Sequence, residues 1–119
     1  MKLTIPREWW LRGEGGGMSR LLRVEDRKMC CVGLFALQLL KMRESQIEDA
    51  KTLSDVRDTG CGWPITLEGK PIGSMSEFYS VNDNICISDD VREGELIKLF
   101  AKLGVTVEFT GPERMEVNR

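Results

Sequence analysis

Apolar residues at helical spacing mark the carboxyl-terminal part of the chain most clearly. They recur at i, i+3, i+4 and i+7 and form one stripe: Leu96, Leu99, Phe100 and Leu103. The other side of this predicted helix is charged: Arg92, Glu93, Glu95, Lys98 and Lys102. Gly104 supplies the left-handed residue that ends a helix, and the N-cap is one of Ser88, Asp89 and Asp90. Val105–Phe109 then alternates apolar and polar residues, which predicts a half-buried strand.

A second helix is predicted where the chain is apolar on nearly every side. Met29–Leu40 spans about 12 residues, too few to cross a bilayer, which takes about 20. We therefore expect a central buried helix. The positive charges of Lys41 and Arg43 suit its carboxyl end, because the helix dipole is negative there.

The remaining patterns are shorter. Lys2–Ile5 alternates polar and apolar residues before Pro6, which predicts a strand. We expect it to lie beside Val105–Phe109, because apolar edges at both chain ends need a shared sheet. Ser19–Val24 predicts a further strand. Weaker signals indicate a helix, a hairpin tip, one helical turn and a polar turn: Ser45–Val56, Glu68-Gly69, Ser76–Tyr79 and Asn82–Asn84.

Together these elements predict one α+β domain over residues 1–119, with a small, mainly antiparallel sheet packed by two main helices. A length of 119 residues fits one domain and leaves little room for a second. The 41% of hydrophobic residues is enough for one modest core. Residues 111–119 are polar, and we expect them to form a frayed tail.

The net charge of −2 hides an uneven distribution along the chain. Residues 1–43 contain nine basic and four acidic side chains, a net charge of +5. Residues 44–119 contain eight basic and fifteen acidic ones, a net charge of −7. Two arrangements fit this distribution. Either the basic third forms one face for an anionic partner, or the two parts fold together and their charges interleave.

The chain has no histidine, which removes imidazole bases, His-activated nucleophiles and His metal ligands. The cysteines follow no CxxC pattern, so no zinc site is indicated: Cys30, Cys31, Cys61 and Cys86. The first residues do not resemble a signal peptide, because Arg7 and Glu8 follow at once. We expect a reduced, soluble, cytoplasmic protein with buried thiols, no metal and no cofactor.

A glycine-rich segment, residues 13–17, is the main candidate for ligand binding. Consecutive glycines let backbone N–H groups converge on an anion, nearby arginines add charge, and tryptophans can stack on a base. The spacing matches neither GxGxxG nor a P-loop. The alternative is a flexible loop between strands, with one tryptophan in the core and one at an interface. The predicted contacts to a ligand or partner are Arg7, Trp9, Trp10, Arg12, Gly13, Gly15, Gly16, Arg20 and Trp63.

No catalytic group is indicated, so the chain is predicted not to be an enzyme. Lys28 precedes Cys30 and favours a thiolate, but the apolar run around Cys30 favours burial. Three acidic residues lack the spacing of a calcium loop, and helix capping accounts for two of them: Asp83, Asp89 and Asp90. Aromatic residues in loops, Trp63 and Phe78-Tyr79, indicate a protein-binding surface instead.

Several segments share the turn and fold patterns of one protein family: Trp10–Gly13, Ser19–Arg23, Lys28–Gly33, Val81–Asp83, Arg92–Phe100 and Gly104–Phe109. In these segments, which span most of the chain, the protein resembles a family of small uncharacterised proteins from phage and prophage genomes. Two parts depart from the family. At the turn before the cysteines the family favours Asp-Gly, whereas this chain has Asp26-Arg27. The segment Glu44–Ser80 also matches the family poorly.

The resemblance implies a small non-enzymatic accessory protein in the host cytoplasm. Small phage proteins of this size commonly block a host defence complex, sequester a signalling nucleotide or modify a host enzyme. By this analogy we expect the chain to bind and inhibit a host protein, for example a component of CRISPR or another anti-phage defence. The alternative is a small-molecule binder that sequesters a nucleotide or another phosphate-bearing signal through the Arg/Gly-rich loop. A pI near 5.3 disfavours double-stranded nucleic acid as the sole partner. No membrane partner is expected, and self-association is left open.

Overall fold

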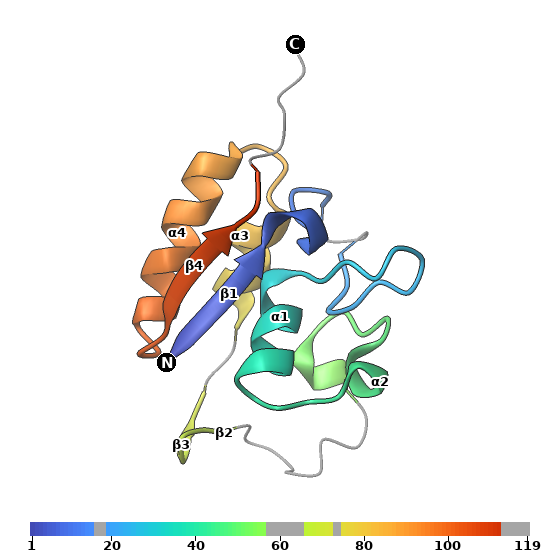
Figure 1. Cartoon of the computed structure of the whole chain (residues 1–119), viewed down its shortest axis with the longest axis vertical. Coiled ribbons are helices and arrows are strands. Elements are labelled where there is room, and N and C mark those ends of the chain that lie inside the picture. The colour runs from blue at the N-terminus through green and yellow to red at the C-terminus, as the bar shows by residue number, and fades with distance from the viewer. Residues whose placement is uncertain (16–18, 57–65, 73–74, 113–119) are drawn as a thin grey trace.

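The computed structural model shows helices packed against one side of a small sheet (Figure 1). The residues that it describes are 1–15, 19–56, 66–72 and 75–112. Gly16, Cys61 and Trp63 lie outside the described residues, as does the chain after residue 112. The binding roles of Gly16 and Trp63 and the frayed tail therefore stay predictions.

The main sheet consists of two parallel strands, β1 (Lys2–Pro6) and β4 (Thr106–Thr110). Leu3 pairs with Val107, and the register continues to the end of both strands. This confirms that the amino-terminal strand and the last strand are neighbours. One face of the pair packs on the core, whereas the other carries an exposed ion pair between Lys2 and Glu108 at 3.0 Å.

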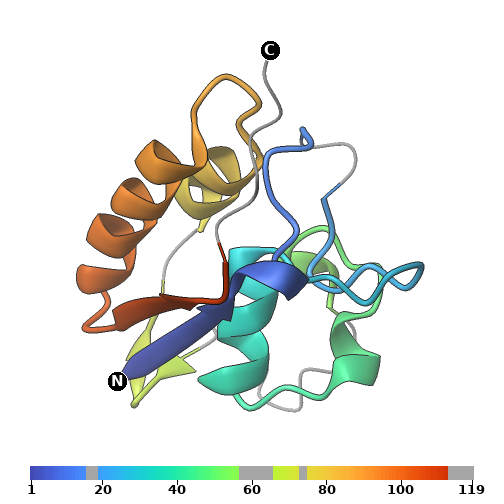
Figure 2. The ribbon, with the colours of Figure 1, turned by 45° about the horizontal axis from the view of Figure 1, so that its top comes forward.

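Three longer helices surround the core. α1 (Cys31–Gln38) packs beside β1 and α4 (Asp89–Ala101) beside β4, while α3 (Ser76–Asp83) contacts both helices (Figure 2). The connections contain one short helix and two 3-10 turns, α2 (Glu44–Ile47), η1 (Arg7–Trp9) and η2 (Leu53–Asp55). The architecture is thus mixed α and β, as predicted at that level.

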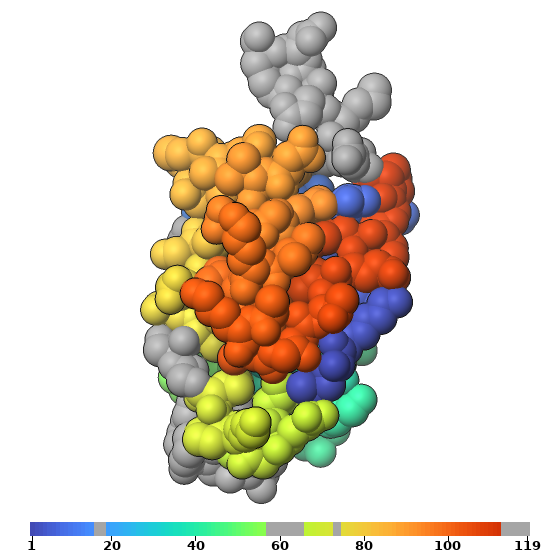
Figure 3. Space-filling model, turned by 90° about the vertical axis from the view of Figure 1, so that its left-hand side faces the viewer, coloured from blue at the N-terminus to red at the C-terminus, as the bar shows by residue number. Residues whose placement is uncertain are grey.

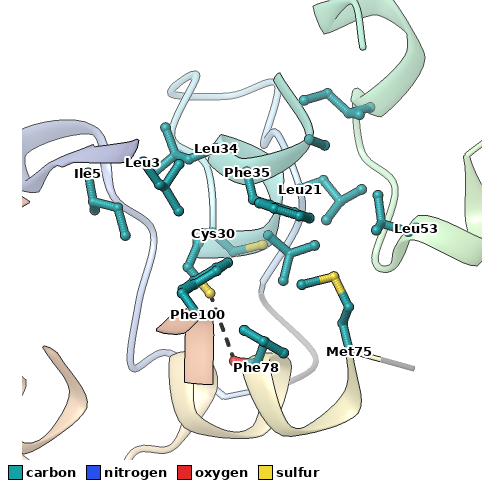
Figure 4. Packing of buried hydrophobic residues seen from close by; sticks show 14 of the residues in the cluster. Leu3, Ile5, Leu21, Cys30, Leu34, Phe35, Leu53, Met75, Phe78 and Phe100 are labelled. Carbon is teal, nitrogen blue, oxygen red and sulfur yellow. Dashed lines mark hydrogen bonds between the residues drawn. The ribbon is translucent and has the colours of Figure 1, made fainter. Parts of the chain in front are cut away.

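Phenylalanines from three helices meet in the centre of the core (Figure 4). The ring centroid of Phe100 on α4 lies 5.5 Å from that of Phe35 on α1 and 4.7 Å from that of Phe78 on α3. Leu3 and Ile5 of β1 belong to the same buried cluster. Because aromatic pairs have preferred orientations, these contacts fix how the helices lie relative to one another.

Gly33 allows α1 to approach the backbone of an earlier segment. A Cβ atom at Gly33 would lie 1.8 Å from the carbonyl oxygen of Leu21, far inside van der Waals contact. Any other residue type would force the two backbones apart. The buried helix predicted over Met29–Leu40 is confirmed, but its apolar pattern gave no sign of this contact.

The prediction of a mainly antiparallel sheet is wrong for the main pair of strands. β1 and β4 are parallel, because the chain between them passes through the helices and returns in the same direction. Within the described residues, antiparallel strands occur only in a hairpin of β2 (Thr66–Leu67) and β3 (Lys70–Pro71). Its tip, Glu68-Gly69, has φ angles of 51° and 80°, as a type I′ turn requires. The predicted hairpin is therefore confirmed.

The strand predicted over Ser19–Val24 is not formed. The backbone of this segment bonds to several different segments, so no ladder develops: Leu21 N–H donates to the carbonyl of Ala50, and Arg23 N–H to that of Lys28. Only an isolated bridge between Leu22 and Glu48 resembles strand pairing in this part of the described chain. Leu21 and Leu22 are both fully buried, whereas Val24 is exposed, so the apolar residues of this segment do not share one face.

Helix boundaries differ from the predictions in two places. The helix predicted over Ser45–Val56 is interrupted, because Asp49 has a φ of 56°, which a right-handed helix cannot contain. α3 is longer than the single turn predicted and includes Asn82. For α4 the predicted ends are confirmed, with Ser88 Oγ accepting a hydrogen bond at the N-cap and Gly104 at a φ of 76°.

Candidate functional site

The adjacent tryptophans of the predicted ligand site point in opposite directions. The side chain of Trp9 is half exposed, at 51%, whereas Trp10 is buried, at 2%. One tryptophan therefore belongs to the core and one to the surface, as the alternative reading of the glycine-rich loop expected. Burial does not agree with the prediction that Trp10 contacts a ligand or partner.

Arg12 was predicted to bind an anion, but it is part of the protein interior. It is only 4% exposed, and its guanidinium lies 4.4 Å from the centre of the Trp10 ring. Its Nη1 donates to the carbonyl oxygens of Arg7 and Trp10, both at 3.1 Å, and its Nε lies 3.4 Å from a carboxylate oxygen of Asp89. The structure therefore corrects its role to a structural one.

The other two arginines of the predicted site also have internal contacts. Arg7 forms a bidentate ion pair with Glu93, at 2.8 and 2.9 Å, and donates to the carbonyl of Gly111 at 2.7 Å. Arg20 donates to the carbonyl of Ser19 at 2.8 Å. Planar bidentate pairing of this kind satisfies a guanidinium strongly. The ion pair between Arg7 and Glu93 therefore connects η1 to α4.

The glycine-rich loop is held against the end of α3. The N–H of Gly13 donates to the carbonyl of Asn82 at 2.8 Å, and that of Gly15 to the carbonyl of Asp83 at 3.0 Å. Both glycines have positive φ angles, 67° and 83°, which glycine adopts without strain. These two N–H groups thus anchor the loop and do not converge on an open anion site.

Asn82 connects three segments, and the sequence assigned it only to a turn. Its Oδ1 accepts hydrogen bonds from the Trp10 indole at 2.8 Å and from the Cys31 N–H at 3.1 Å. Its Nδ2 donates to the carbonyl of Leu11 and to a carboxylate oxygen of Asp83, both at 2.9 Å. The Asn82 side chain is fully buried, and its amide group both accepts and donates hydrogen bonds.

Arg92 was predicted on the charged, outer side of its helix, which the structure corrects. It is 2% exposed, because its guanidinium turns toward the loop between α3 and α4. There it donates to four backbone carbonyls, those of Val81, Asn82, Asn84 and Ile87. We call the buried polar group of Trp10, Arg12, Asn82, Asp89 and Arg92 the Asn82 junction.

A cavity of about 640 Å³ lies on the surface next to this junction. The glycine-rich loop, α3 and the loop between α3 and α4 contribute its walls, which include Gly15, Tyr79, Val81, Asp83, Asn84 and Ile85. Ile85 is 71% exposed, the largest exposure among the large apolar side chains of the described chain. We call this feature the loop cavity. Its charged wall residue is a carboxylate, so it does not favour a phosphate.

A second cavity, of about 690 Å³, lies beside α2. Its walls include both signs of charge: Arg43 and Lys51, together with Glu48, Asp49 and Asp55. Opposite charges in one wall cancel much of the field that attracts an anion. Neither cavity therefore offers the positive surface that a phosphate-bearing ligand needs.

The buried thiols are poor nucleophiles. Burial raises the pKa of Cys30 to about 12 and raises the pKa of Cys31 well above its usual value. Since only a thiolate attacks, both side chains are unreactive at neutral pH. Among the described cysteines Cys86 is exposed. Residues that the structure describes bring no three His, Cys, Asp or Glu side chains together as metal ligands.

Folding brings part of the positive charge of residues 1–43 against acidic residues of the remainder. Basic residues of the first 43 positions pair with acidic residues of the remainder: Lys2 with Glu108, Arg7 with Glu93, Arg12 with Asp89, and Arg27 with Glu44 and Glu48. The charges interleave, as the second of the two arrangements expected. The excess of basic residues in positions 1–43 therefore does not require a single basic face.

Comparison of the chain with models of known protein families, with curated proteins and with solved structures finds no match. Within the described residues, no helix is both long enough and apolar enough to cross a membrane.

Proposed function

We propose that this chain is a non-enzymatic accessory protein that binds another protein through Ile85 and the loop cavity. The observation that carries this proposal is the 71% exposure of Ile85 beside a cavity of about 640 Å³. An exposed isoleucine beside a concave wall suits a contact surface in which each partner inserts apolar side chains into the other.

The Asn82 junction supports this proposal because it makes the surface rigid. Hydrogen bonds from Gly13 and Gly15 hold one wall to the end of α3, and Arg92 holds the loop that carries Ile85. A preorganised surface loses little conformational entropy on binding, which favours affinity. The raised pKa values of Cys30 and Cys31 further support a role other than thiol catalysis.

The resemblance to phage accessory proteins identifies the partner to test first, which is a host protein such as an anti-phage defence component. Immobilised protein should retain that partner from a host lysate, and the variant Ile85→Lys should reduce its retention at least about 10-fold, because a lysine cannot fill an apolar pocket. The matched control is Ile97→Lys on α4, another exposed isoleucine, which does not line the cavity. Its retention should equal that of the wild type. No retained protein, or equal loss in both variants, would contradict the proposal.

The nucleotide-sequestering alternative makes a different prediction, which a thermal-shift screen tests. A nucleotide at 100 times its Kd would stabilise the fold by about 2.7 kcal/mol. We expect no shift with mono-, di-, tri- or cyclic nucleotides, because Arg7 and Arg12 already pair with carboxylates and Gly13 and Gly15 with carbonyls. A saturable shift would favour the alternative over protein binding.

A further inference from the structure

Every second residue of β4 directs its backbone groups away from β1. The N–H of Thr106 donates to the carbonyl of Met1 at 2.8 Å, so residues 106, 108 and 110 face β1. The N–H and C=O groups of Val107 and Phe109 consequently face the outer edge of the sheet. Within the described residues, none of these four groups has a hydrogen-bond partner.

The outer edge of β1 is treated differently, although it is equally an edge. There Gln38 places its side-chain amide against the strand, with Nε2 donating to the carbonyl of Thr4 at 2.7 Å and Oε1 accepting from the Thr4 N–H at 3.0 Å. The amide thus takes the place of a neighbouring strand. Proteins cover or block edges that would otherwise pair, and here only one of the two is blocked.

The sequence of β4 is suited to pairing with itself. Thr106-Val107-Glu108-Phe109-Thr110 has the same order of polar and apolar residues in both directions. In an antiparallel pair centred on Glu108, Val107 therefore lies opposite Phe109 of the second copy. These are the residues whose N–H and C=O groups face outward, so they form the hydrogen-bonded positions of the new ladder.

We propose that the outer edge of β4 binds a second copy of this chain, antiparallel and about a two-fold axis at Glu108, to give one four-stranded sheet. The pairing satisfies all four outward groups on each copy. It also extends the apolar face of the two-stranded sheet, which alone is near the lower limit of stability for a sheet.

An exposed apolar side chain lies where the second copy would contact α4. α4 and β4 lie side by side on one face of the molecule (Figure 3). Glu93 reaches Arg7, which also bonds the carbonyl after β4, so this flank of α4 is turned toward the sheet. Ile97 follows Glu93 by one turn on the same flank and is 45% exposed. A two-fold axis at the middle of β4 brings Ile97 of both copies together.

Charge at the centre of the interface is balanced. Two Glu108 side chains would oppose each other across the axis, which is unfavourable for like charges. Each is already paired with Lys2 of its own copy at 3.0 Å, on the exposed face of the sheet. The centre therefore consists of two ion pairs side by side, with no net charge.

The register can be tested by disulfide formation across the axis. Opposed residues at a non-hydrogen-bonded position have Cα atoms about 4.5 Å apart, within the range of a disulfide. In a background with Cys61→Ser and Cys86→Ser, the variant Glu108→Cys should form a covalent dimer on mild oxidation. The matched control is Thr106→Cys on the same face, whose two copies would lie more than about 10 Å apart and should stay monomeric.

Sedimentation velocity over a concentration series tests the same interface without a cross-link. The wild type should show a monomer–dimer equilibrium. Ile97→Lys should raise the dimer dissociation constant at least about 10-fold, since it places two lysines together at the axis. Val91→Lys, on another side of α4 and 49% exposed, should leave it unchanged. Circular dichroism confirms that each variant is folded.

Three results would overturn self-pairing through β4: a monomer at every concentration, a dimer that tolerates Ile97→Lys, or equal cross-linking of Glu108→Cys and Thr106→Cys. Self-pairing is independent of protein binding through the loop cavity. Ile85→Lys should lose the partner and keep the dimer, whereas Ile97→Lys should lose the dimer and keep the partner. The failure of either proposal is therefore visible separately.

Discussion

At the Asn82 junction, polar groups from three parts of the chain satisfy one another in the interior. At the outer edge of β4, the backbone groups of two residues face outward and have no partner among the described residues. Asn82 uses its amide for four hydrogen bonds, and Arg92 bonds four carbonyls. Val107 and Phe109 have no bond on their outer side within the described residues. Both regions are rich in hydrogen-bonding groups, yet only the second leaves such groups available to a further partner.

The difference teaches that the number of charged or polar residues in a segment is a poor guide to binding. The arginines of the glycine-rich region looked like an anion site because they are close together in sequence. In the structure Arg7 and Arg12 instead form ion pairs with Glu93 and Asp89 of the same chain. A buried polar group must be satisfied to be tolerated, so a dense buried network is more often structural. Binding surfaces are found where satisfaction is incomplete or where apolar side chains are exposed.

Thiol labelling gives the largest expected contrast between interior and surface. With its pKa raised to about 12, Cys30 has a thiolate fraction about 1000-fold below that of a thiol with a pKa near 9. Iodoacetamide should therefore modify Cys86 long before Cys30 or Cys31, as followed by peptide mass spectrometry. Rapid labelling of all three in the folded protein would mean that the junction opens readily.

Replacing Arg92 should have the largest effect on stability. Arg92→Met keeps most of the side-chain volume but removes the hydrogen bonds to four carbonyls and the ion pair with Asp89. We expect a loss of about 3–5 kcal/mol in the free energy of unfolding, the usual result of breaking a buried ionic network. Urea denaturation measures it. The control, Lys98→Met on the exposed side of α4, should change stability by no more than about 0.5 kcal/mol.

Asn82→Asp is nearly isosteric and should cost about 2–3 kcal/mol at pH 7, because it replaces a donor with an acceptor facing the Leu11 carbonyl and the Asp83 carboxylate. Protonation restores a donor at this position. The difference from wild type should therefore shrink as the pH falls toward 4. Asn84→Asp, at an exposed position, serves as the control, and an equal loss in both variants would contradict the role of the junction.

The smallest effect is expected at the surface turn of Asp26. A hydrogen bond from Arg23 lowers the pKa of Asp26 to about 2, so this ion pair stabilises the fold above pH 4 and ceases to do so as the pH falls through 2. Asp26 is about one-third exposed, and solvent screening limits the effect of Asp26→Asn to about 0.5–1 kcal/mol at pH 7. Denaturation curves of the two proteins should converge near pH 2. A difference that persists there would assign the loss to something other than the ion pair.

Local patterns predicted those elements whose signals lie within a few residues. The buried helix around Phe35, the stripe and caps of α4, the tip at Glu68-Gly69 and the alternation of β4 were all predicted in this way. The regions that failed depend on long-range contacts. Ser19–Val24 was predicted as a strand but bonds to several segments, and the direction of β4 depends on the path of the chain through three helices. At the loop cavity, Gly15 was among the residues predicted from the sequence, but the sequence had no means of identifying Asn82 or Ile85.

By itself the sequence determined most of the local elements and the absence of histidine chemistry, because periodicity and composition act within one segment. It also predicted that the two chain ends pair, because the apolar edges of both predicted strands need a shared sheet. Only the tertiary structure decided which arginines are buried, which tryptophan faces outward and which strand edge stays open. Burial and hydrogen-bond satisfaction depend on residues distant in sequence, such as Arg12 and Asp89 or Thr4 and Gln38. The two partner surfaces that we propose therefore follow from what folding leaves exposed at Ile85 and without backbone partners at Val107 and Phe109.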